Sequence, residues 1–261
     1  MKKKYVYLNF LSVFFNQVAF GWTLLGNRGW NHASLTLHAN ATQCGITSAQ
    51  LNNLISQAIQ AWNGVTTSRL EWTFQQADST TTVGQFLSGT ATDTPYIGCD
   101  SSFQSDTQQD PNSVPAVTLN TGTDPIEYAG IVLNAEPSTF ANIATIYAIN
   151  PTVVALIIGH ELGHVVGLGH TSDPSALMYY SVSNKSQLTL TLDDQEGVSY
   201  LYPRAELWGG PMGCAAAPLS WDLARHPPHY APFEIIWWIL PLLGLALPRR
   251  KRRGSSRKMR T

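Results

Sequence analysis

The sequence predicts an α+β fold, because strand-like segments come first, one helix lies among them and two helices come last. With 261 residues, 44% hydrophobic side chains and 13% charged ones, the chain can build a large core and is neither a disordered chain nor a coiled coil. Between residues 22 and 203 there are fourteen acidic and three basic side chains. This negative charge excludes nucleic acid as a partner.

Four segments are predicted to be strands. In the first, Leu35 and Leu37 alternate with more polar residues, which is typical of a half-buried strand. Turn residues separate the last two strands. The four predicted strands are 33–39, 70–74, 114–119 and 131–135.

Three segments are predicted to be helices. The first begins at Ser48, ends at Gly64 and has apolar residues at helical spacing. The second begins at Asn150-Pro151, an N-cap followed by a proline in the first helical position, and runs to Gly167. The third covers 192–202, with two acidic residues in its first turn and a proline after its end.

The segment HELGHVVGLGH, which begins at His160, carries the chemistry that the sequence predicts. On a helix, His160 and His164 lie on one face and can bind one metal ion. Glu161 can reach a metal-bound water without being a ligand. Gly167 lets the chain leave the helix and return His170 as a third ligand. Three neutral histidines leave one tetrahedral position open, as catalytic zinc requires.

This site predicts a zinc-dependent endopeptidase. Bound zinc lowers the pKa of its water to about 7 and polarises a substrate carbonyl. Glu161 would take the proton of that water as general base and pass it to the leaving amine. The expected partner is a protein or peptide substrate, and we expect the enzyme to be a monomer.

The same segment, followed by TSDPSALMY over residues 171–179, resembles the matrixins, here of bacterial type, within the metzincin metalloproteases. The resemblance covers roughly residues 30–203 and implies a mixed twisted sheet with an active-site helix and a C-terminal helix. It implies that Met178 supports the metal ligands, and that the acidic start of the last helix is tied to this methionine turn. It also implies that 114–119 or 131–135 is the edge strand that pairs with an extended peptide.

Two departures from the matrixin pattern concern metal binding. Tyr180 stands where matrixins have proline and is similar to the extra zinc ligand of the astacins and serralysins, so it is a candidate zinc ligand or oxyanion stabiliser. The alternative, which we favour, is an aromatic wall of the specificity pocket. No histidine lies between Asn40 and Gly159, so the structural zinc site of animal matrixins is not expected, and we expect one catalytic Zn²⁺.

Acidic loops in the body are candidates for binding Ca²⁺ through carboxylate oxygens. None of them forms a recognisable calcium loop, so a solvated acidic surface is the favoured alternative. The residues concerned are Asp93, Asp100, Asp106, Asp110 and Asp124.

The two ends of the chain predict export and membrane attachment. Residues 1–21, three lysines followed by an apolar run and small residues, predict a signal peptide cleaved before Trp22; an uncleaved anchor is the alternative. Residues 22–204 would then be the metalloprotease domain, and the proline-rich stretch 205–231 a linker. Residues 232–261 contain an apolar run followed by RRKRR, which predicts a membrane-spanning segment with its basic end in the cytoplasm.

The tail, with the GGPMGC motif before it, resembles the C-terminal sorting tails of bacterial envelope proteins. That resemblance implies processing near Cys214 and a cell-surface or released enzyme. In an exported chain we expect a disulfide between Cys44 and Cys99, with two free thiols as the alternative.

Two rival functions remain open. One is a catalytically silent, zinc-stabilised binding module on the envelope, which the presence of Glu161 makes less favoured. The other is a surface structural protein whose tail is the functional part.

Overall fold

The computed structural model describes residues 21–26, 28–75, 79–92, 94–121 and 125–204. The predicted linker and tail, including Cys214, and almost all of the predicted signal peptide lie outside the described residues. None of the described helices is long and apolar enough to cross a membrane. In chain order the elements are β1 (Ser34–Asn40), α1 (Ser48–Asn63), β2 (Glu71–Gln75), α2 (Val83–Leu87), β3 (Tyr96–Asp100), α3 (Phe103–Thr107), β4 (Ala116–Thr121), β5 (Tyr128–Asn134), α4 (Ile143–Ile149), α5 (Pro151–Val165) and α6 (Leu192–Leu201).

The five strands form one mixed sheet in the order β2-β1-β3-β5-β4. The first four strands of this order run parallel, and β4 is antiparallel to β5. Because β4 pairs only with β5 within this sheet, it is an edge strand. The segment predicted at 114–119 is therefore the edge. The alternative edge, 131–135, is wrong, because β5 lies between β3 and β4.

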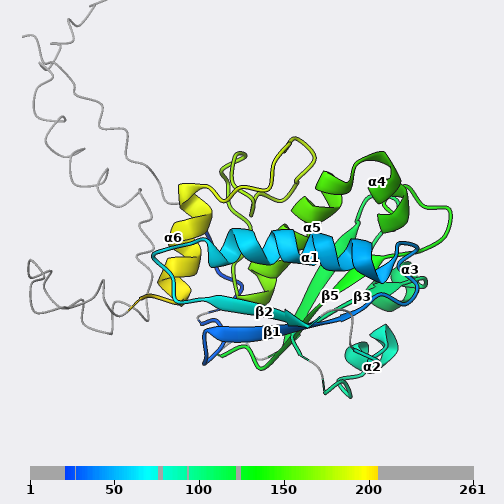
Figure 1. Ribbon diagram of the computed structural model, residues 1–261, viewed down its shortest axis with the longest axis horizontal. Helices are drawn as coiled ribbons and strands as arrows, with labels where there is room; N and C mark the ends of the chain where they lie inside the picture. Colours follow the sequence, from blue (N-terminus) through cyan, green and yellow to red (C-terminus); the bar gives the residue numbers. More distant parts are fainter. Residues whose placement is uncertain (1–20, 27, 76–78, 93, 122–124, 205–261) are drawn as a thin grey trace, which may run out of the picture. The chain divides into compact units, whose positions relative to one another are not determined.

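The helices α1 and α5 lie on one side of the sheet, and the short helix α2 lies on the other (Figure 1). The main core joins α1 and α5 to one face, through residues such as Leu37, Ile97 and Ile131. A smaller apolar cluster lies on the other face, where Phe86 of α2 packs with Val132. Successive residues of β5 thus enter different clusters, as the alternation of a strand requires. The predicted α+β fold with a mixed sheet is confirmed.

The helix α1 confirms the predicted spacing of apolar residues. Thr47 is the N-cap and forms a capping box with Gln50. On α1, Trp62 is fully buried and donates a hydrogen bond from Nε1 to the Gly159 carbonyl of α5 at 2.8 Å. All six apolar residues that the spacing predicts are buried: Leu51, Leu54, Ile55, Ala58, Ile59 and Trp62.

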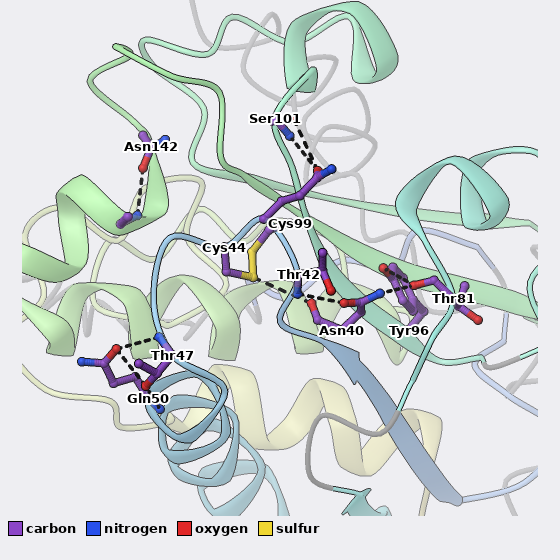
Figure 2. The surroundings of a disulfide bond; sticks show 12 residues. Asn40, Thr42, Cys44, Thr47, Gln50, Thr81, Tyr96, Cys99, Ser101 and Asn142 are labelled. Carbon is purple, nitrogen blue, oxygen red and sulfur yellow. Dashed lines mark hydrogen bonds between the residues drawn. A yellow bond between two sulfur atoms is a disulfide. The ribbon is translucent and has the colours of Figure 1, made fainter.

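The disulfide predicted between Cys44 and Cys99 is present, with an S–S distance of 2.02 Å (Figure 2). It joins the loop between β1 and α1 to the sheet strand β3. Both cysteines are buried in the main core. The alternative of two free thiols is therefore excluded.

The strand β3 and the short helices α2, α3 and α4 were not predicted from the sequence. The strand β3 is only five residues long and every one of them is buried, so the sequence has no apolar–polar alternation there. It also lies in a region rich in polar residues, which favoured a loop. A single residue, Asn150, separates α4 from α5. It is both the C-cap of α4 and the N-cap of α5.

Candidate metal centre

The helix α5 brings the first two histidines together, as predicted. Asn150 accepts a hydrogen bond from the backbone N–H of Thr152, and Pro151 occupies the first helical position. From there α5 runs into the core, and from Val154 to its end every residue except His164 is buried. His160 is buried and His164 is half-buried.

The turn after α5 returns the third histidine. Gly167 has φ +107°, a left-handed conformation that side chains rarely adopt, so glycine is required there. The loop from Gly167 to His170 pairs with the segment Thr23–Leu25. The Gly169 N–H donates to the Thr23 carbonyl at 2.7 Å, and Thr23 Oγ1 donates to the His170 carbonyl at 2.7 Å.

The three histidine rings converge on one point. The Nε2 atoms of His160, His164 and His170 lie 3.1, 3.2 and 3.3 Å from one another. Three nitrogens bound to one tetrahedral zinc at about 2.0–2.1 Å would lie about 3.3–3.4 Å apart. The spacing of these nitrogens therefore fits a zinc ion.

The hydrogen-bond partners of the Nδ1 atoms determine which nitrogen of each histidine ring carries a proton. His160 Nδ1 lies 2.7 Å from the Leu177 carbonyl, and His164 Nδ1 lies 2.7 Å from the Leu168 carbonyl. Because a carbonyl only accepts, each Nδ1 must carry a proton, and in the neutral rings each Nε2 keeps its lone pair. Two lone pairs 3.1 Å apart repel one another, and a cation between them turns this repulsion into attraction.

Burial keeps the histidines neutral. It lowers the pKa of His160 to about 3, with a smaller effect from His164, and it also lowers the pKa of His164 and of His170. Neutral imidazoles are the form that binds metal. Within the described residues, these three are the one group of three or more histidine, cysteine or acidic side chains that could hold a metal ion.

Glu161 lies beside the metal-binding histidines and is 7% exposed. Burial raises its pKa to about 7, and hydrogen bonds from Thr118 oppose that rise. Thr118 belongs to the edge strand β4, and its Oγ1 lies 2.7 Å from Glu161 Oε2 and 3.1 Å from the Glu161 carbonyl. Thr118 was not predicted from the sequence. The sequence does contain a signal for it. Thr118 is a polar residue on the same face of its strand as Ala116, which is buried in the main core.

Met178 is 1% exposed and lies under α5 in the turn that the resemblance predicts. A Cβ on Gly163 would collide with the Met178 sulfur, so the glycine allows their close contact. Asp194 at the start of α6 is 1% exposed and accepts hydrogen bonds from the backbone N–H groups of Leu177 and Met178 at 2.8 and 2.9 Å. The acidic start of the last helix therefore contacts the methionine turn.

Tyr180 and the acidic loops lie outside the histidine cluster. Tyr180 is 68% exposed and its ring lies 4.3 Å from that of Tyr179. Asp100 and Asp106 line a polar cavity near the disulfide, whereas Asp93 and Asp124 lie outside the described residues. The calcium site stays a prediction, and so does either role of Tyr180.

Comparison with known proteins agrees with this geometry. The matrixin family profile matches residues 29–203. The chain belongs to the matrixin family. Human neutrophil collagenase is 24% identical over 179 residues, which is 68% of this chain and 34% of the collagenase.

Two further relatives match shorter parts of this matrixin. Human matrix metalloproteinase-20 is 38% identical over 79 residues, which is 29% of this chain and 14% of the relative. Metalloendoproteinase 2-MMP of Arabidopsis thaliana is 48% identical over 44 residues, 16% of this chain and 12% of the relative. The matched segments span at most about a third of these three relatives. The family implies a zinc metalloendopeptidase, and the three-histidine cluster fits its metal.

Proposed function

We propose that this matrixin is an endopeptidase that cleaves extracytoplasmic proteins with one zinc ion held by His160, His164 and His170. The single observation that carries the proposal is the convergence of the three Nε2 atoms within 3.3 Å of one another, next to a buried glutamate. Zinc bound there would polarise the scissile carbonyl and acidify a water molecule.

Glu161 is the general base of the proposed mechanism. A general base must accept a proton and also be ionised at the working pH, and burial raises the pKa of Glu161 in the metal-free site, which makes its carboxylate a stronger base than an exposed one. After accepting the proton of the attacking water, Glu161 can return it to the amine nitrogen as the peptide bond breaks. Met178, packed against Gly163, supports the turn whose Leu177 carbonyl orients His160.

The edge strand β4 is the proposed binding site for an extended peptide. Within the sheet, its other side has no strand partner among the described residues. An edge strand offers N–H and C=O groups that a peptide can pair with. Since Thr118 of β4 contacts Glu161, a peptide paired with this strand would lie beside the general base.

The proposal includes the predicted location, which rests on the sequence of both ends. Signal cleavage before Trp22 would export the enzyme. The apolar and basic tail after residue 232 would tether it to the membrane, and processing near Cys214 would release it.

The test compares the full-length exported protein with the Glu161→Gln variant, which has nearly the same shape. We expect about one zinc per chain in both proteins and a 10²–10⁴-fold lower rate of peptide cleavage in the variant. Intact mass of the exported protein checks both predicted processing sites. Zinc in both proteins without cleavage in either would favour the silent binding module, and no zinc in either would refute the proposed site.

A further inference from the structure

The Thr118 hydroxyl joins the edge strand β4 to the glutamate that we propose as general base. Its Oγ1 lies 2.7 Å from Glu161 Oε2 and 3.1 Å from the Glu161 carbonyl on α5. Among the described residues, no other side chain forms a hydrogen bond with the Glu161 carboxyl group. Thr118 is therefore its main polar contact within the protein.

The position of Thr118 on its strand points its side chain at α5. Its neighbours Val117 and Leu119 pack against the small apolar cluster on the opposite face of the sheet. Ala116, two residues before Thr118, belongs to the main core that contains α5. The alternation of the strand thus places a hydroxyl where an apolar side chain would otherwise face the helix.

A hydroxyl carries one hydrogen, so Thr118 can donate to one acceptor at a time. The shorter distance, and the negative charge of an ionised carboxylate, direct this hydrogen to Oε2. The backbone of Thr118 also hydrogen-bonds the Glu161 carboxyl group, so this one residue holds the group by both its backbone and its side chain. If the hydroxyl were lost, the buried carboxyl group would lose its side-chain donor and would be held less firmly.

We infer that Thr118 is a positioning residue that fixes the orientation of the Glu161 carboxylate through the hydrogen bond to Oε2. The inference rests on the proposed function, because it assigns a role within that reaction. It also links the strand proposed to bind the peptide with the base that acts on it. Fixing the carboxylate lowers the cost of reaching the reactive geometry, so its loss should appear in kcat rather than in KM.

The experiment measures kcat, KM and zinc content for the full-length protein and three variants. Thr118→Val keeps the shape and removes the hydroxyl, and Thr118→Ser keeps the hydroxyl. Thr36→Val is the matched control, because Thr36 is a half-buried threonine on β1 whose hydroxyl, among the described residues, forms a hydrogen bond only with the Thr73 hydroxyl, at 2.8 Å. We expect Thr118→Val to lower kcat about tenfold, with KM within about twofold and zinc unchanged. Thr118→Ser should restore most of kcat, and Thr36→Val should leave it unchanged.

A thermal unfolding series tests the contact without relying on activity. In chelator, Thr118→Val should lower the unfolding midpoint by about 2–4 °C when Glu161 is present and by clearly less when Glu161 is replaced with alanine. Equal shifts in both backgrounds would overturn the inference, because the hydroxyl and carboxylate would then not be coupled.

The kinetic outcomes are equally decisive. An unchanged kcat in Thr118→Val, a rise in KM alone, or a Thr118→Ser variant as slow as Thr118→Val would overturn the positioning role. A wild-type protein that binds zinc and shows the coupling but cleaves no peptide would refute the proposed function, and the catalytic role of Thr118 with it.

Discussion

Replacing Asp194 with alanine tests how the last helix supports the metal centre. Asp194 accepts hydrogen bonds at 2.8–2.9 Å from the backbone N–H groups of Leu177 and Met178, and from the N–H and hydroxyl of Thr191. The Leu177 carbonyl in turn lies 2.7 Å from Nδ1 of His160. The substitution therefore removes four hydrogen bonds from a turn that orients one of the three histidines.

The magnitude follows from these four bonds. At about 1 kcal/mol for each buried hydrogen bond, Asp194→Ala should lower the free energy of unfolding by about 4 kcal/mol. Asp194→Asn keeps one acceptor oxygen, but its NH₂ group would face a backbone donor, so we expect about half that loss. Because the turn orients a ligand through its second nitrogen, zinc affinity should fall about 10–100-fold.

The assay is urea unfolding in the presence of a chelator, followed by zinc titration of the folded variants. Asp193→Ala is the matched control, because Asp193 lies in the same first turn of α6 but, among the described residues, accepts a single hydrogen bond, from the Gly21 N–H at 2.8 Å. The control should lose no more than about 1 kcal/mol. The reasoning is refuted if Asp194→Ala is no more destabilising than Asp193→Ala, or if its zinc affinity is unchanged.

Two further predictions concern acid and the disulfide. Burial lowers the pKa of His160 from 6.5 to about 3, so the unfolded chain binds the proton first and stability falls as the pH drops below 6.5. In chelator, His160 should contribute up to about 1.4 kcal/mol of lost stability per pH unit down to about pH 3, and His160→Gln should reduce the slope measured by urea unfolding at several pH values, with His164 and His170 still contributing. Replacing Cys44 and Cys99 together with alanine opens a loop with a sequence separation of 55, and urea unfolding should show a loss of about 4 kcal/mol. A loss below about 1 kcal/mol would contradict that entropy argument.

The sequence predicted the histidine cluster because its determinants lie within eleven consecutive residues. Helical spacing brings His160 and His164 together, and the left-handed Gly167 needs only local backbone geometry to return His170. The apolar face of α1 was equally predictable, because a 3.6-residue period needs no knowledge of distant partners.

The contacts around this cluster could not be predicted in the same way. Thr118 meets Glu161 across 43 residues, and Thr23 meets His170 across 147. The first contact depends on the order of strands in the sheet, and the second depends on the path of the chain near its start. The periodicity of the sequence encodes neither. Of the two segments predicted as the edge strand, 131–135 was wrong for the same reason. It lies in β5, which is internal to the sheet because it also pairs with β3.

Burial of α5 has opposite effects on the pKa values of its acidic and basic side chains: it keeps the imidazoles in the form that binds metal, and it favours the protonated form of Glu161. Desolvation disfavours charge, so it lowers the pKa of His160 and raises the pKa of Glu161. Near neutral pH the metal-free site therefore holds neutral imidazoles and a partly protonated carboxyl group. A divalent cation beside Glu161 favours its ionised form, because an opposite charge within a few ångströms lowers the pKa of a carboxyl group. Metal binding would thus itself release the proton that Glu161 must lose to act as the proposed general base.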